Sequence, residues 1–400
     1  MQQSILIGFV NTNKIMEKRT RIGFYYVWDK SWMGGVLYAQ NLLKALNTLE
    51  DKNKPFIDVY CRSMAAFEDL KKNTDYPYLA VIIINDEAFY KKVYRKIVKT
   101  LFGFKARCKV DMFKIQHEDE MIFPYGFGSA TDKLVYWCPD FQEKYLPELF
   151  PKETIRGREL SIRAIAERGI PIVFSSHDSE NDFKRFYPEY NNKTFVVHFA
   201  VDHADFSYVN IEELKLKYGI KGNYLLCANQ FWKHKNHLFL FRAYYKALQK
   251  GLNLQLVCTG KLQDDRNPKY IEEVQCFIAE NNLSEKILLL GLIDSDELHC
   301  LMKNSYAVVQ PSLFEGWNTT VEDCKLLNKF IFLSDLSVHQ EQVNKNVCFF
   351  NPRNEDDLCQ KLLKVKAEDE YCDYYHNLRT FGEDFRRIID YAVKKRNRIL

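Results

Sequence analysis

Two acidic residues, Glu315 and Asp323, stand eight positions apart in the stretch 307–341. Apolar runs at 307–309 and 330–333 flank a loop and a helical stretch, a pattern that predicts a strand–loop–helix–strand unit of a parallel sheet. Ligands bind such sheets at the carboxyl ends of the strands, where Glu315 and the start of the helix would lie. Carboxylates placed there can accept hydrogen bonds from ligand hydroxyl groups.

The start of this helix favours phosphate. Thr319 and Glu322 have the Thr-x-x-Glu spacing of a capping box, which predicts that the helix begins at this point. Free backbone N–H groups and a partial positive charge gather at such an end and attract anions. We therefore expect phosphate to bind the helix N-terminus and hydroxyl groups to bind the carboxylates.

The stretch PSLFEGWNTTVEDCKLLNKFIFLSD, residues 311–335, resembles the donor-site signature of retaining glycosyltransferases of family four, which have the GT-B fold. That signature is a Glu, a Gly, an aromatic residue and a second acid eight positions after the first. The resemblance implies that Glu315 holds the sugar ring of the donor and that Asp323, where the family usually has Glu, holds the ribose diol. Glu322 is the alternative ribose contact, or else only the capping partner. The donor-binding residues predicted around the helix start also include Gly316, Asn318 and Thr319.

A second phosphate contact is expected in the loop 229–236, which follows an apolar strand and precedes a long amphipathic helix. In the resembled family an Arg and a Lys, five residues apart, bind the donor phosphates here. Lys235 matches the Lys and can act as a point charge; alone it would be an ordinary exposed charge near a helix start. Gln230 stands at the Arg position, and Lys233 is the candidate to replace the missing charge. Glu315 and Lys235 are the predicted catalytic residues.

The first half of the chain offers weaker signals. Gly34 and Gly35 stand between a predicted strand at 21–27 and a predicted helix, either as a plain tight turn or as a place where backbone approaches phosphate closely. In the resembled family a Gly-Gly loop faces the donor phosphates, so both join the predicted donor site. Asp140 follows a predicted strand and is an acceptor-side candidate, or a turn residue. Its surroundings resemble a PDFQH-like stretch of relatives, but Glu143 replaces the His.

These features predict an α/β protein with the GT-B fold, in which two Rossmann-like domains face each other across a cleft. We expect an acceptor domain at 1–200, a nucleotide-sugar donor domain at 201–375, and a terminal helix at 376–400. In GT-B enzymes such a helix crosses back to the first domain. No cofactor and no metal are expected, because the triplet at 294–296, Asp-Ser-Asp, follows a strand and is explained as a helix N-cap.

Composition limits the class of protein. The chain has 400 residues, of which 46% are hydrophobic and 28% charged, as in soluble globular proteins. A net charge of +4 does not favour nucleic acid as a partner. Eleven cysteines without a CxxC pair indicate a reducing compartment. The longest aliphatic run, 79–84, is far shorter than the ~20 residues that span a bilayer, and no secretory signal is evident, so we expect a cytoplasmic protein.

The predicted activity is transfer of a sugar from a nucleotide-diphosphate sugar to a hydroxyl group of a glycan or lipid-linked acceptor, with retention and without metal, in surface polysaccharide or glycolipid synthesis. Two alternatives stay open. A nucleotide-sugar epimerase would need further acids and His in the first half, which has few. A non-catalytic nucleotide-sugar-binding or assembly protein is favoured by Gln230 and Asp323, which depart from the family pattern.

The segment 89–109 predicts a basic amphipathic helix, because apolar residues recur every four positions and eight basic residues have no acid among them. It can bind an anionic membrane surface, or pack on the sheet with its charges in water. Pelleting with anionic vesicles at low salt distinguishes the two. We expect co-sedimentation that weakens with added salt, since each basic residue near the surface contributes ~1 kcal/mol; protein that stays in the supernatant would exclude the membrane.

Overall fold

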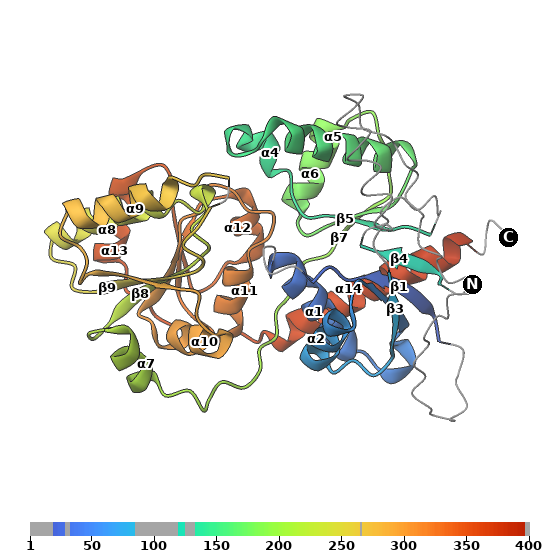
Figure 1. The fold of residues 1–400 in the computed structure, drawn as a ribbon, viewed down its shortest axis with the longest axis horizontal. Coiled ribbons are helices and arrows are strands. Elements are labelled where there is room, and N and C mark those ends of the chain that lie inside the picture. The colour runs from blue at the N-terminus through green and yellow to red at the C-terminus, as the bar shows by residue number, and fades with distance from the viewer. Residues whose placement is uncertain (1–18, 29–32, 85–118, 125–132, 265, 397–400) are drawn as a thin grey trace, which may run out of the picture.

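The computed structural model describes residues 19–28, 33–84, 119–124, 133–264 and 266–396. Two α/β halves are visible in Figure 1, one built on β1 to β7 and the other on β8 to β13. This architecture confirms the predicted mixed α/β fold with parallel sheets. The basic segment 89–109 lies outside the described residues. Within the described residues, no helix is long and apolar enough to cross a membrane.

The first half contains parallel strands in the order β3-β2-β1-β4, followed by β5-β6-β7. A parallel bridge between Ile122 and Leu134 joins the two sets. The strands are β1 (Arg21–Tyr25), β2 (Phe56–Cys61), β3 (Leu79–Ile83), β4 (Met121–Phe123), β5 (Tyr136–Cys138), β6 (Ile172–Phe174) and β7 (Thr194–Val196). The helices are α1 (Met33–Asn47), α2 (Met64–Thr74), α4 (Gln142–Tyr145), α5 (Lys152–Glu167) and α6 (His177–Phe186).

The second half is a six-stranded parallel sheet in the order β10-β9-β8-β11-β12-β13. This is the doubly wound arrangement, whose order reverses between β8 and β11 and so opens a crevice at their carboxyl ends. The strands are β8 (Tyr224–Ala228), β9 (Gln255–Thr259), β10 (Ile287–Gly291), β11 (Ala307–Gln310), β12 (Ile331–Ser334) and β13 (Val347–Phe350). The helices are α7 (Ile211–Tyr218), α8 (His237–Gln249), α9 (Tyr270–Glu280), α10 (Ser295–Asn304), α11 (Thr319–Leu326), α12 (Ser337–Gln342) and α13 (Glu355–Lys364).

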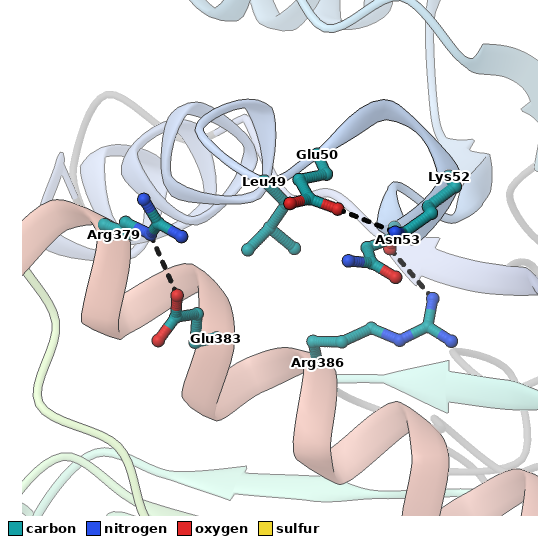
Figure 2. A pocket seen from close by; sticks show the side chains of 7 residues that line it. All are labelled: Leu49, Glu50, Lys52, Asn53, Arg379, Glu383 and Arg386. Atoms are coloured by element: carbon teal, nitrogen blue, oxygen red, sulfur yellow. Dashed lines mark hydrogen bonds and ion pairs between the residues drawn. The ribbon is translucent and has the colours of Figure 1, made fainter.

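The long helix α14 (Tyr375–Arg396) belongs to the core of the first half, although it follows the whole second half in sequence. Phe381, Phe385 and Ile388 are fully buried there against α1. Figure 2 shows the outer side of this contact, where Arg386 Nη1 donates to the carbonyl of Asn53 at 2.8 Å. The chain therefore crosses between the halves twice.

Two local predictions need correction. Asn318, not Thr319, is the N-cap of α11, because its side chain accepts from the amide of Val321 at 3.2 Å. Asn and Thr are both good caps, so their adjacency hid the true start. Gly34 and Gly35 lie in the first turn of α1 and not in a loop before it. Asp294 does occupy the N-cap position of α10, although its side chain makes no capping hydrogen bond.

Gly382 in α14 tests the tightness of the contact with α1. A Cβ atom at this position would lie 2.3 Å from the carbonyl oxygen of Ala45, so the helices would have to separate. We expect Gly382→Ala to lower the free energy of unfolding in urea by ~1–3 kcal/mol, as overpacking does. The control is Gly157→Ala in α5, where nothing lies within 4 Å; there alanine should stabilise by up to ~1 kcal/mol. Equal effects of the two substitutions would contradict the close approach.

Candidate active site

The predicted catalytic residues, Lys235 and Glu315, meet at the carboxyl ends of β8 and β11. Lys235 ends a short 3-10 turn, η3 (Lys233–Lys235), and its Nζ lies 2.5 Å from Oε1 of Glu315. Their side chains are 14% and 9% exposed. The neighbouring strands bring these two residues together over eighty positions of sequence, and the result is an almost buried ion pair.

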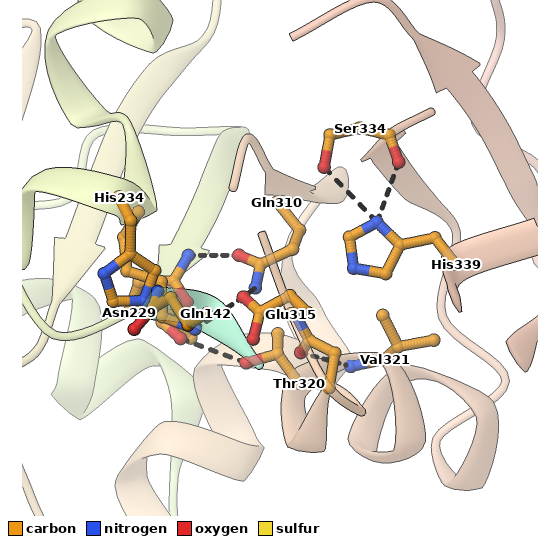
Figure 3. Close-up of polar contacts among 12 residues, drawn as sticks. Gln142, Asn229, His234, Gln310, Glu315, Thr320, Val321, Ser334 and His339 are labelled. Atoms are coloured by element: carbon orange, nitrogen blue, oxygen red, sulfur yellow. Dashed lines mark hydrogen bonds and ion pairs between the residues drawn. The ribbon is translucent and has the colours of Figure 1, made fainter. Parts of the chain in front are cut away.

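The loops that carry this pair are tied to each other. The amide of Leu313 donates to the carbonyl of His234 at 2.8 Å. Gln310 lies beside Glu315, with its Nε2 at 3.4 Å from Oε1, and its own amide oxygen accepts from Asn229 (Figure 3). Burial, followed by the charges of Lys235 and Arg266, holds the pKa of His234 well below its usual range, so its ring is neutral. The position of Glu315 is thus fixed by backbone and side chain together.

The two substitutes for the missing arginine do not join this pair. The side chain of Gln230 is used elsewhere, because its Oε1 accepts from the amide of Lys261 at 2.8 Å. Lys233 is exposed, and its backbone amide donates to Asp264 at 2.9 Å. Within the described residues, Lys235 is the cation that the structure places against Glu315.

The N-terminus of α11 lies beside Glu315. This helix carries Glu322 and Asp323, the two candidate ribose contacts, and the structure gives them different surroundings. Glu322 is 1% exposed and fully occupied: its oxygens accept from Gln342 at 2.8 Å, from Lys325 at 2.9 Å and from the Tyr374 hydroxyl at 2.5 Å. Gln342 also binds the backbone of Asn318: its Oε1 accepts from the amide and its Nε2 donates to the carbonyl. Glu322 therefore holds the elements together.

Asp323, the next residue of α11, is 7% exposed and lies against His203. Its Oδ1 lies 3.0 Å from Nε2 of His203, but the two make no directed hydrogen bond, and neither buried atom has a hydrogen-bond partner among the described residues. His203 stacks on His299 at 3.5 Å between ring centroids. Burial and the nearby His203 lower the pKa of His299 to about 4. A buried acceptor without a partner is a place for a ligand hydroxyl.

Two histidines of this region were not predicted as site residues. His203 lies in the connection after β7, and no spacing in the sequence points to it. His339 is fully buried near Glu315, with Nδ1 at 2.7 Å from the Ser334 carbonyl and Nε2 without a partner among the described residues. Burial lowers the pKa of His339 to about 4, although the charge of Glu315 opposes this. The imidazole is thus neutral at pH 7.

The loop after β11 also touches the first half. Gly316 is packed so closely that a Cβ would lie 2.3 Å from the Pro139 carbonyl oxygen. Asp140, the predicted acceptor-side residue, directly follows Pro139. Arg158 donates to Oδ1 of Asp140 at 2.6 Å and also pairs with Glu143 at 2.9 Å. A cavity of about 390 Å³ opens between the segment around Asp140 and α5. Asp140 therefore lies beside the donor loop, with Arg158 fixing its carboxylate.

Aromatic residues extend this contact on both sides of Glu315. Phe314 packs on Tyr145 of α4, with ring centroids 5.2 Å apart, and joins a buried cluster with Leu146 and Leu149. Trp317 stacks on His198 at 4.5 Å, and its Nε1 donates to the Phe199 carbonyl at 3.0 Å. Every residue from Phe314 to Trp317 except Glu315 itself thus has a described contact with the first half. By contrast, no described contact joins Gly34 or Gly35 to the ion pair.

Glu341 of α12 provides a further contact across the cleft. Its carboxylate accepts from the amides of His177 and Asp178, the first residues of α6, at 2.7 and 3.1 Å. His198 Nε2 lies 2.6 Å from the same carboxylate. Burial alone would raise the pKa of Glu341, but these hydrogen bonds lower it below its ordinary value of 4.5. Ser176 is the N-cap of α6, and the Glu341 carboxylate of the opposite half accepts from two further free amides of the same first turn, where negative charge is favoured.

Comparison with known proteins agrees with this architecture. Residues 210–382 match the family model described as "Glycosyl transferases group 1". The chain is 24% identical over 239 residues to the O-antigen chain mannosyltransferase RfbU of Salmonella typhimurium. This alignment covers 60% of this chain and 62% of that protein. It is 30% identical over 257 residues to the N-acetylgalactosamine-N,N'-diacetylbacillosaminyl-diphospho-undecaprenol 4-alpha-N-acetylgalactosaminyltransferase of Campylobacter jejuni, covering 60% of this chain and 66% of that one. The alignments thus span slightly less than two thirds of each relative.

Among solved structures, a glycosyltransferase from Rickettsia africae superposes with a TM-score of 0.60 at 16% identity, covering 96% of this chain and 98% of that chain. Two parallel doubly wound halves that face each other have the GT-B fold, as the sequence predicted. The match to the group 1 glycosyl transferases covers residues 210–382, which form most of the second half.

The contact made by Glu341 predicts a pH-dependent contribution to stability. Because the folded pKa is depressed, the contribution is complete above the ordinary value of 4.5 and is lost as the pH falls through the lower folded value. We expect Glu341→Gln to lower the free energy of unfolding by ~1 kcal/mol at pH 7, and the difference from wild type to shrink toward pH 3. Urea titrations at both pH values measure it. Glu285→Gln, at a largely exposed carboxylate, should change little at either pH; a pH-independent loss in Glu341→Gln would refute the ionic contribution.

Proposed function

We propose that the chain transfers a sugar from a nucleotide-diphosphate sugar to a hydroxyl acceptor, with retention at the anomeric carbon and without a metal in the transfer. The observation that carries this proposal is the buried pair Lys235–Glu315, placed beside the N-terminus of α11 at the carboxyl edge of a doubly wound sheet. A cation, free helix amides and a carboxylate at one point suit a ligand that joins a diphosphate to a sugar.

The charges suggest how the donor enters. A diphosphate can take over the ammonium group of Lys235, which releases Glu315 to accept from the hydroxyls of the sugar ring. Asp323, with its unused Oδ1, is placed for the ribose diol, whereas Glu322 is occupied by Tyr374 and Gln342. When the sugar–phosphate bond breaks, Lys235 and the α11 amides stabilise the charge that grows on the leaving diphosphate.

Two arguments support the proposal of retention. One is the resemblance to a retaining family, and the other is that the carboxylates of Glu315 and Asp140 are both engaged by cations. Glu315 is paired with Lys235, and Asp140 is held by Arg158. In a front-face route the departing phosphate takes the proton of the acceptor hydroxyl, so that no separate carboxylate base is needed. Asp140 beside Gly316 then binds the acceptor. The close packing of Gly316 on Pro139 brings the loop after β11 against the first half next to Asp140.

The names of the relatives suggest the acceptor. One acts on the O-antigen chain and the other on a diphospho-undecaprenol-linked sugar. We extend this to a glycan or lipid-linked acceptor in surface polysaccharide or glycolipid synthesis. We place the reaction in the cytoplasm, since all ten described cysteines are free. The basic segment 89–109 would provide the contact with an anionic membrane.

One observation favours the non-catalytic alternative. Gln230 replaces the arginine of the resembled family, and its side chain binds the Lys261 amide. The donor phosphates would then meet one lysine where two cations are usual. A protein that binds nucleotide sugar without transferring it would show this weaker phosphate site.

Ligand-dependent thermal unfolding tests the site with UDP, GDP, ADP and their common sugars. A ligand at one hundred times its Kd should stabilise the protein by ~2.7 kcal/mol. We expect Lys235→Ala to weaken binding of nucleotide and nucleotide sugar alike, because it removes the phosphate contact. Glu315→Ala should weaken only the nucleotide sugar, because its partner is the sugar ring.

Each shift is measured against the ligand-free variant, since either substitution leaves a buried charge without its partner. Lys233→Ala, an exposed lysine of the same turn, serves as the matched control and should bind like wild type. Binding without turnover over a panel of acceptors would favour the non-catalytic alternative. An absence of any shift in wild type would contradict the donor site itself.

A further inference from the structure

A second polar cluster lies between the two halves and takes no part in the proposed transfer. His177 is the first residue of α6, His198 follows β7, and Glu341 belongs to α12. Two histidines of the first half thus meet one carboxylate of the second. One nitrogen from each ring and one carboxylate oxygen lie within 4.8 Å of one another.

The orientation of the two rings suits a common ligand. Their planes stand at 80° with centroids 5.7 Å apart, so the in-plane lone pairs can converge from two directions. His198 Nε2 is already 2.6 Å from Glu341 Oε1. A tetrahedral ion with bonds of ~2.0–2.2 Å holds its ligand atoms roughly 3.3–3.6 Å apart. The contact between His198 and Glu341 therefore lengthens on binding, and the His177 ring, whose side chain is 65% exposed, is free to turn toward the ion.

The surroundings orient these residues as outer groups do around a metal. Trp317 stacks flat on His198, with an interplanar angle of 5°, and fixes the plane of the ring. The α6 amides hold the Glu341 carboxylate. Glu180 stands 3.8 Å from Nδ1 of His177 and adds negative charge. Two imidazoles and one carboxylate with open positions are a ligand set for zinc and similar transition metals, whereas magnesium prefers oxygen ligands.

The other histidine–carboxylate group of the described residues does not have this geometry. His203 and His299, beside Asp323, stack face to face at 3.5 Å and 24°. The lone pairs of nearly parallel stacked rings do not meet at one point. That group also contains the proposed ribose contact, so it belongs to the donor site.

We propose that His177, His198 and Glu341 bind one divalent transition-metal ion of the zinc class, which links the two halves of the protein. The ion replaces the contact between His198 and Glu341 with bonds to both. Because its ligands come from opposite sides of the cleft, it favours the closed arrangement. It holds the halves together and has no role in bond breaking.

Calorimetric titration of the metal-stripped full-length chain with zinc chloride tests this proposal without donor or acceptor. Cys276, an exposed thiol, is first replaced by Cys276→Ser in all proteins, so that it does not compete. We expect one zinc ion per chain and no heat with magnesium. His177→Gln and Glu341→Gln should each weaken zinc binding about tenfold or more. His376→Gln, at another exposed histidine, should bind like the parent.

Thermal unfolding supplies the second measurement, because an ion that joins the halves raises the melting temperature only when both sides hold it. We expect zinc to raise it in the parent and in His376→Gln, and much less in His177→Gln and Glu341→Gln. The exposed position of His177 makes that variant informative even if Glu341→Gln folds poorly. Zinc binding that His177→Gln leaves unchanged would overturn the site. Binding that is lost in His177→Gln but kept in a folded Glu341→Gln would overturn the link between the halves.

Discussion

The arrangement of the candidate site depends on the ion pair between Lys235 and Glu315. Two opposite charges lie almost out of water, and removal of either would leave the other uncompensated, which typically costs 3–5 kcal/mol. The backbone bond from Leu313 to His234 and the amide of Gln310 hold the pair in place. Without a ligand, the two charges thus neutralise each other. A diphosphate sugar can exchange for this internal contact, because it offers an anion to the lysine and hydroxyls to the carboxylate.

The donor loop has a second constraint, since it is clamped against the first half. Gly316 touches the Pro139 carbonyl, Phe314 enters an apolar cluster with α4, and Trp317 lies on His198. The geometry of Glu315 therefore depends on contacts from both halves. Separation of the halves would break the contacts of both residues that flank Glu315.

The sequence predicted the parts that depend on local pattern. The GT-B fold followed from the family resemblance of residues 311–335, and the strand–loop–helix–strand unit from apolar pattern. That Lys235 and Glu315 form an ion pair was not predicted and is a finding of the structure. The cap of α11 was misplaced by one residue, since Asn318 and Thr319 are both good caps. His203, His339 and Arg158 act through contacts between distant segments, which no periodicity encodes. The hydrogen bond between the Gln230 side chain and the Lys261 amide is likewise a tertiary contact that the sequence does not reveal.

The two crossings of the chain lie side by side. Tyr374, just before α14, donates through its hydroxyl to Glu322 and accepts from the amide of Val201 at 2.9 Å, in the connection that follows β7. Two adjacent covalent connections form a hinge between the halves. They leave one easy rotation, about the line that joins them, and resist twisting or sliding of one half along the other. Opening of the cleft then has a single path, and the edge opposite the hinge travels farthest.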